Sequence, residues 1–564
     1  MFETESGKHW ISELLHQQAS CIMQATCSGP APAAAANLGR RRYSRGGSRH
    51  QRVVGAKMLR ALLLLLVLLV TQTAGRPLLP GPARPALVGG TGASDECKNG
   101  VAQQKEESDI VGNRFSTVIA VTAAAASSSS LDGNSDTLAS VFNLAKTILG
   151  AGVLALPSGV AAFSDKRIAL VPASGLLVFM SIMSAYSFAS IGHACRLHDT
   201  RTFSDAWAKS VGPRYKVVIS SVITFKTFFA CLAFSIIIGD SFSSIMKSVG
   251  ASSFFAARNN VILGLTTLVI FPLCMLKNMD ALKYTSVLGL GGISYCALFI
   301  ATRFFDGSYR VGGKYFRDIS ASMQPSFGQR LPGSTPVHVI FVLIAMISTA
   351  FSAHYNAPKF WIDLKNKTAA RYNKVVSSAF LFAAITYMSV MWAGFLTFGG
   401  HSTGFILNNY SSKDIFATLA RLAVGLAILF GYPLTFSALR EGAFDLMKLP
   451  ATGEARKKAL VPVTVSALSL ITSLALVIKN LGIVVALSGA LIGALLIYFV
   501  PAVMNLCNIR SAALTATAKK NKGAAVVFSR MQQLEMTANY VMAFSGIVIA
   551  VIGVATTLMG SSAH

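Results

Sequence analysis

Residues 141–157 read VFNLAKTILGAGVLALP, an apolar stretch with Gly150, Ala151 and Gly152 near its middle and Pro157 five residues later. Glycine disfavours a helix interior and proline removes a backbone hydrogen bond, so this stretch predicts a broken helix. In a membrane, such a break is tolerated only where the freed backbone lines a cavity or is buried in protein. Free amides there can bind a carboxylate, and free carbonyls an ammonium group or a cation. Close helix packing through small residues is the alternative interpretation.

The composition of the whole chain indicates a polytopic membrane protein. Of its 564 residues, 53% are hydrophobic and only 13% are charged, whereas a soluble domain carries about 25% charged residues. The net charge of +27 could suggest a nucleic-acid partner. However, the basic residues lie mainly between apolar runs or near the N-terminus, so membrane topology explains them better. We therefore expect a lipid bilayer, and no nucleic acid, as the environment of this chain.

Eleven apolar runs follow, each long enough to cross a bilayer core of about 30 Å. They cover 138–162, 168–194, 216–245, 259–276, 283–303, 337–357, 375–399, 414–438, 459–479, 482–506 and 535–558. The runs are continuous and do not alternate every second residue, which predicts helices and excludes a β-barrel. Lys and Arg are more frequent in the loops after even-numbered runs, so we expect those loops, and the start of the first run, in the cytosol.

The region before the membrane domain divides into three segments. We interpret 1–57 as disordered or as a gene-model extension, and 58–75 as a signal-peptide-like apolar segment that is short for a span. The polar, Ala/Ser-rich segment 76–137 is a linker or a targeting segment. A cleaved signal would place this segment outside the cytosol, opposite to what the loop charges predict. The membrane domain itself is expected at 138–560.

A second interrupted run lies at 342–358, VLIAMISTAFSAHYNAP. It gathers polar side chains before its proline: Ser348, Thr349, Ser352 and His354. The runs at 138–162 and 337–357 are the first helices of two five-helix halves. Interrupted helices at matching positions of two halves are the best sequence indication of a transport site. His354 alone is equally consistent with a hydrogen bond between helices.

Few charged side chains interrupt the apolar runs. Lys146 lies near the first break and Lys226 lies about ten residues into the third run, so both are candidates for ion coupling. Asn143 is a third candidate, either for a cation or for tying helices together. Asp240 and Arg421 lie near helix ends, where we expect them to extend towards the membrane surface.

No enzymatic or metal chemistry is indicated by the motifs. The eight cysteines form no CxxC pair, and the sequence has no Walker A loop and no HExxH motif. We therefore expect neither an enzyme nor a bound metal or cofactor, and no ATP-driven pump.

Residues 138–506 resemble the amino acid/auxin permease family in four separate motifs that occur in the expected order. These are Asn143 to Pro157; Phe351 to His354 with Pro358, Leu364 and Arg371-Tyr372-Asn373; Gly394 to Gly399 with Ile406 to Tyr410; and Arg421 to Val424 with Pro433, Phe436 and Arg440. The resemblance covers about two thirds of the chain and none of residues 1–137.

This resemblance implies an all-α, LeuT/APC-like five-plus-five inverted repeat with an extra C-terminal helix. It also implies secondary active transport of amino acids. Carried over by position, Gly150, Ala151 and Gly152 would meet the substrate carboxylate. Residues of the second break would meet the amino group or side chain: Thr349, Ala350, Phe351 and Ser352, with His354 beside them.

The coupling ion follows less directly from the resemblance. Sodium-coupled relatives place a Thr two residues before the proline of the eighth helix, but here that position is Gly431. Thr435 and Ser437 are the nearby hydroxyls that could substitute, and Thr147 on the first helix is a further candidate for ion coupling. Lys146 resembles the proton-coupled branches, so we favour protons over sodium.

We expect neutral amino acids as substrates. The alternative is a membrane sensor that binds amino acids without net transport. The plasma membrane, the vacuole and the plastid envelope all remain open as locations, as does the oligomeric state.

Overall fold

The computed structural model describes residue 133 and residues 135–276, 285–330, 336–450, 453–520 and 528–560. These residues all belong to one compact unit. The predicted segments 1–57 and 58–75 lie outside the described residues, as does most of 76–137.

The described residues are mostly helical. Their β-structure consists of two isolated bridges, which pair Ser135 with Leu364 and Ser326 with Gly399. Nine of its helices are long and apolar enough to span a membrane, and a bent pair forms one more span. The nine are Arg167–His198, Pro213–Ser248, Arg258–Met275, Val337–Asp363, Ala369–Phe398, Ile415–Leu446, Glu454–Val477, Leu481–Thr515 and Arg530–Met559. The predicted run 283–303 corresponds to α12 (Thr285–Asp306), which has 22 residues. The prediction of an all-α polytopic membrane protein is confirmed.

Both predicted breaks are present. The first span consists of α4 (Thr137–Ile148), the 3-10 helix η1 (Ala151–Ala155) and α5 (Leu156–Phe163), and its two halves are bent by 46°. The other consists of α13 (Ile340–Ala350), η9 (His354–Asn356) and α14 (Ala357–Asp363).

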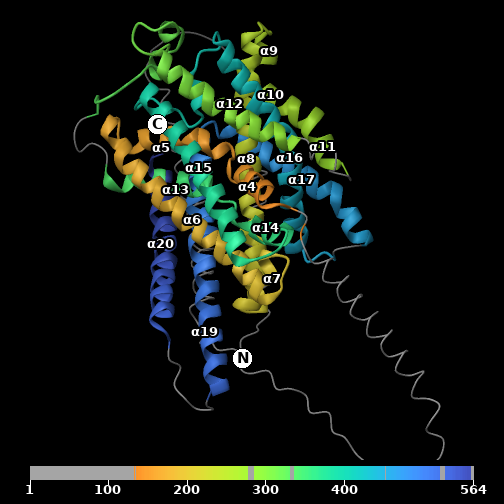
Figure 1. Cartoon of the computed structure of the whole chain (residues 1–564). Coiled ribbons are helices and arrows are strands. Elements are labelled where there is room, and N and C mark those ends of the chain that lie inside the picture. The colour runs from red at the N-terminus through yellow and green to blue at the C-terminus, as the bar shows by residue number, and fades with distance from the viewer. Residues whose placement is uncertain are drawn as a thin grey trace, which may run out of the picture. The chain divides into compact units, whose positions relative to one another are not determined.

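The remaining elements connect and surround these two spans (Figure 1). The helices are α6 (Leu170–His198), α7 (Phe203–Ser210), α8 (Lys216–Ser248), α9 (Ser253–Ala256), α10 (Arg258–Leu265), α11 (Phe271–Met275), α15 (Ala369–Phe398), α16 (Ile415–Leu446), α17 (Glu454–Val477), α18 (Leu481–Ser488), α19 (Val500–Lys520) and α20 (Arg530–Gly560). The π-helical segments are η4 (Thr266–Ile270) and η11 (Gly489–Phe499). The 3-10 turns are η2 (Arg167–Ala169), η3 (Pro213–Tyr215), η6 (Phe316–Asp318), η7 (Ala321–Met323), η8 (Val337–Val339) and η10 (Ile406–Asn409).

The helices pack so that both breaks lie inside the protein. Helix α13 packs against α5, α18, η11 and α20, while α4 and α6 both pack against α15. Close approach of α13 and η11 depends on glycine, because a Cβ on Gly489 would collide with the carbonyl of Ala345, and one on Gly493 would lie 3.0 Å from Cβ of Ser348. Gly489 and Gly493 are therefore small-residue positions at which two helices pack closely.

Candidate functional site: two helix breaks joined by a tyrosine

The two helix breaks touch each other. A Cβ placed on Gly152 would lie 3.5 Å from Cα of Ala350, an ordinary van der Waals contact between the two backbones. Gly150 has an extended backbone, and a Cβ placed on it would approach only the carbonyl of Ile148 within 4 Å. The structure thus brings the predicted residues Gly150, Gly152 and Ala350 into one region, and Ala151 lies between the two glycines.

A tyrosine that the sequence analysis did not single out joins the two breaks. Tyr387 lies on α15, its side chain is fully buried, and its hydroxyl lies 2.7 Å from the carbonyl oxygen of Ile148 and 2.9 Å from that of Ala350. These carbonyls belong to the last residues of α4 and α13, which lack a partner within their helices. A phenol carries one hydrogen, so the two carbonyls share it; the Ile148 carbonyl also accepts from the backbone N–H of Gly150 (2.7 Å). In the sequence, the only indication that Tyr387 could matter is its position within an apolar run.

The helix ends give this region its polarity. Helix C-termini carry a partial negative charge, and α4 and α13 both end at the hydroxyl of Tyr387. Such a pair of ends suits an ammonium group, while the backbone amides of the following turns suit a carboxylate. The region can therefore complement both ends of a zwitterion.

The side chains of the second break point in different directions. The hydroxyl of Thr349 donates to the carbonyl of Val485 on α18 (2.6 Å). Phe351 is fully buried, and its ring centroid lies 5.0 Å from that of Tyr387. The hydroxyl of Ser352 is buried and has no hydrogen-bond partner among the described residues. Of the three side chains, Ser352 alone therefore has a free polar group.

His354 contacts α6. Its ring is fully buried, and Nε2 lies 2.8 Å from the Ser187 hydroxyl and 3.1 Å from the Ser184 carbonyl oxygen. The ring of Phe188 packs against it edge-on, at a centroid distance of 5.6 Å. The interhelical hydrogen bond that the sequence left open for His354 is therefore present.

The comparison with known proteins identifies the family. The model of the family described as transmembrane amino acid transporter protein matches residues 133–559. The chain belongs to this family. It is therefore a membrane amino acid transporter and not an enzyme, and the resemblance to amino acid permeases is confirmed.

Two relatives of this transporter share about a quarter of its residues over the aligned regions. It is 28% identical to the vacuolar amino acid transporter 5 of Schizosaccharomyces pombe, over 64% of this chain and 81% of the relative. It is 24% identical to the putative sodium-coupled neutral amino acid transporter 11 of Rattus norvegicus, over 73% and 86%. The crystal structure of MhsT in complex with L-phenylalanine is similar with a TM-score of 0.47 and 13% identity, over 76% of this chain and 99% of that one.

The ion-coupling candidates of the transporter lie on three helices. Asn143 and Thr147 are exposed on α4, where the Thr147 hydroxyl donates to the Asn143 carbonyl (2.8 Å), and Lys146 is half-buried between them. Lys226 is buried on α8.

On α16, Gly431 and Thr435 are half-buried, one helical turn apart. A Cβ on Gly431 would meet no atom within 4 Å, so a side chain could be accommodated there. α16 packs mainly against α8 and α12, whereas α4 packs against α15. The candidates on α4 and those on α16 therefore lie on helices that pack mainly against different neighbours.

The expectation that Asp240 and Arg421 extend towards the membrane surface was wrong. Arg421 is only 2% exposed, and it donates to the carbonyl of Leu407 (2.8 Å) and to that of Tyr410. The Asp240 carboxylate accepts a hydrogen bond from Arg258 at 2.6 Å. Since each charged group finds partners inside the protein, neither has to reach water.

The loop that contains Arg330 is hydrogen-bonded to the end of the first broken span. The backbone N–H of Arg330 donates to the Asp165 carboxylate (2.8 Å), and its guanidinium donates to the carbonyls of Ala161 and Ala162 at the end of α5. Burial raises the pKa of Asp165, but the hydrogen bonds from the backbone of Arg330 and Gln329 outweigh it, so the net pKa lies below its ordinary value.

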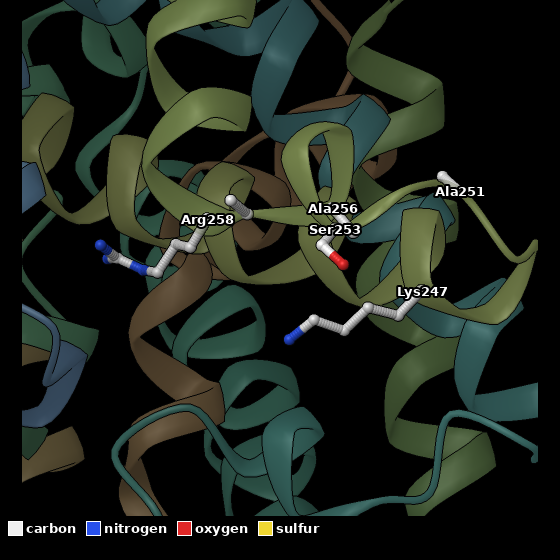
Figure 2. Close-up of a pocket in the computed structure, with 6 residues that line it drawn as sticks. Lys247, Ala251, Ser253, Ala256 and Arg258 are labelled. Carbon is white, nitrogen blue, oxygen red and sulfur yellow. The ribbon is translucent and has the colours of Figure 1, made fainter.

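A pocket of about 320 Å³ lies elsewhere, where α8, α9 and α10 meet (Figure 2). Its lining comes from Lys247, Ala251, Ser253, Ala256, Ala257 and Arg258. Arg258 is already paired with Asp240, and none of the lining residues belongs to either helix break. We therefore place the candidate site of the transporter at the breaks and not in this pocket.

Proposed function

We propose that this chain is a secondary active transporter that moves neutral amino acids across a membrane by alternating access, coupled to protons. The observation that carries the proposal is the meeting of the two broken spans at Tyr387. Free backbone groups at matching positions of two halves offer a zwitterion a partner for each of its charged ends. In this proposal Gly150, Ala151 and Gly152 bind the carboxylate, and Ala350 and Ser352 lie beside the rest of the substrate.

The preference for neutral substrates rests on the carboxylates. The deeply buried carboxylates of the described residues are Asp165, Asp240 and Asp414. Each is already occupied: Asp165 by the backbone of Arg330, Asp240 by Arg258 and Asp414 by Arg303. A cationic side chain would therefore find no free carboxylate among them.

The preference for protons rests on α16. A sodium ion prefers oxygen ligands, and Gly431 offers only its backbone carbonyl. The half-buried Thr435 would have to supply the hydroxyl instead. The names of several relatives mention sodium, so the experiment has to test both ions.

The test is uptake of a mixed set of labelled amino acids into proteoliposomes that contain the full chain. A pH gradient and a sodium gradient are imposed separately, and protein-free liposomes are the control. Accumulation driven by the pH gradient supports proton-coupled transport, while accumulation driven only by sodium would contradict the choice of ion. Binding of amino acids without accumulation under either gradient would favour a sensor.

A further inference from the structure

A group of buried polar side chains lies directly after the break in α13, and we call it the His354 cluster. It consists of Ser184 and Ser187 on α6, Ser352 and His354 after α13, and Tyr498 on η11. All five are buried, with exposed fractions between 0% and 7%. Three helical segments that are distant in sequence therefore place polar groups at one interior point.

The contacts of His354 determine which ring nitrogen carries the hydrogen. The Ser187 hydroxyl donates to the Ser184 carbonyl at 3.1 Å, so its only hydrogen is already used. The same carbonyl, which can only accept, lies 3.1 Å from Nε2 of His354. We therefore assign the hydrogen to Nε2, which leaves Nδ1 as the bare nitrogen of the neutral ring.

Nδ1 of His354 has no hydrogen-bond partner among the described residues. The hydroxyl of Ser352, two residues earlier, likewise has no partner among the described residues. Buried polar groups are nearly always paired, so two unpaired groups this close in the chain are unusual. The lone pair of a bare imidazole nitrogen can accept a proton.

The surroundings of the ring determine what a bound proton meets. Lys226 on α8 is 8% exposed, and its ammonium is close enough to act on His354 electrostatically. From α6 the ring faces Ser184, Ser187 and Phe188, and from α15 it faces Phe380. Tyr498 of η11 interacts with Ser184.

Among the described residues, no carboxylate contacts the ring. A positive charge on His354 would lie near the ammonium of Lys226, and like charges disfavour each other.

We propose that Nδ1 of His354 binds and releases the co-transported proton. The proton adds to the lone pair of Nδ1 and forms an imidazolium, whose Nε2–H remains held by α6. It leaves from the same atom when access changes, so no other bond is made or broken. This inference rests on the proposed proton-coupled transport and assigns that coupling to one atom.

The first test is His354→Gln in full-length protein in proteoliposomes. Glutamine keeps an N–H donor for the contacts with α6 but cannot bind a proton at neutral pH. We expect exchange of labelled for unlabelled amino acid across the membrane to remain measurable, because exchange needs no net proton movement. Accumulation driven by a pH gradient, and proton uptake that depends on substrate, should both be lost.

The second test does not need the histidine to be replaced. Ser187→Ala removes a hydrogen-bond partner of Nε2 that stabilises the charged ring, so the pH midpoint of transport should move to lower values. The matched control is Ser190→Ala, one turn further along α6, where the hydroxyl donates to the Tyr186 carbonyl and accepts from the Asn505 amide (3.2 Å). The pH midpoint of transport by Ser190→Ala should equal that of wild type.

The outcomes separate this inference from the function on which it rests. If wild type does not transport, or accumulates amino acids with sodium alone, the proposed coupling fails first. If wild type is driven by protons and His354→Gln still accumulates substrate in a pH gradient, His354 is not the proton site. Equal pH midpoints for Ser187→Ala, Ser190→Ala and wild type would likewise overturn the assignment, even if His354→Gln does not fold.

Discussion

Replacing Tyr387 by phenylalanine removes one oxygen atom from the junction of the two helix breaks. The aromatic ring stays, so its packing against Phe351 is kept. The carbonyls of Ile148 and Ala350 lose the hydroxyl that they share. The Ile148 carbonyl keeps the Gly150 N–H, whereas the Ala350 carbonyl loses its donor, and leaving a buried acceptor without its donor costs about 1–3 kcal/mol. If that hydroxyl holds the two breaks in their binding arrangement, this cost reduces the fraction of protein in that arrangement.

The expected effect is a rise in the substrate concentration that gives half-maximal uptake. A cost of about 1–3 kcal/mol corresponds to a change of about 5-fold to 150-fold, so we expect at least a fivefold rise. The assay is the concentration dependence of uptake in proteoliposomes, with the amount of inserted protein measured in parallel.

The matched control is Tyr372→Phe, on the same helix. The Tyr372 hydroxyl is also buried and donates to one carbonyl, that of Ala357 (3.2 Å), beyond the second break. The Tyr372→Phe variant should lose about as much thermal stability as Tyr387→Phe, while the substrate concentration for half-maximal uptake stays within about twofold of wild type. Equal half-saturation in Tyr387→Phe, Tyr372→Phe and wild type would refute the role of Tyr387 at the site.

Three further predictions concern glycines and a lysine. Gly152→Ala should keep uptake, because its Cβ would make an ordinary contact at 3.5 Å with Ala350, whereas Gly152→Val should abolish uptake while the protein still reaches the membrane. Gly489→Ala should destabilise the protein by about 1–3 kcal/mol through collision with a carbonyl of α13; thermal unfolding in detergent measures this, and Gly175→Ala, which has open space, is the control. Lys146→Ala should keep the pH dependence of uptake if the proton binds elsewhere, and a changed dependence would move the coupling site to α4.

The spans and their breaks could be predicted because their signals are local. A run of about 20 apolar residues has to cross the bilayer as a helix, since no other partner satisfies its backbone there. Gly150, Gly152 and Pro157 weaken the helix at their own positions, so the break appears where these residues stand. The break in α13 lies where its polar residues and Pro358 had placed it.

The partners of the side chains could not be predicted, because they depend on direction and not on position. Thr349 and Ser352 are three residues apart, yet the first hydroxyl donates to a carbonyl of α18 and the second has no partner among the described residues. Which way each points is set by the helix ending at Ala350, where the backbone leaves its regular turn. Tyr387 is more than 200 residues from Ile148 in sequence, so no local pattern links them.

The partners of the buried charged side chains could not be predicted from the sequence either, in this case for an energetic reason. A position near a helix end allows a long side chain to reach water, and this argument led to the wrong expectation for Arg421. The guanidinium instead donates to the carbonyls of Leu407 and Tyr410 in the loop before α16. A charge in a membrane protein goes to whichever partner costs least desolvation, and an irregular loop with free carbonyls competes well with water. The same reasoning applies to the two breaks: the Ile148 carbonyl has donors in the Gly150 N–H (2.7 Å) and the Tyr387 hydroxyl, whereas the Ala350 carbonyl has only its share of that hydroxyl among the described residues. The second lone pair of the Ala350 carbonyl can accept a hydrogen bond from a substrate ammonium group while the tyrosine stays in place, which is a physical reason for the substrate to bind there.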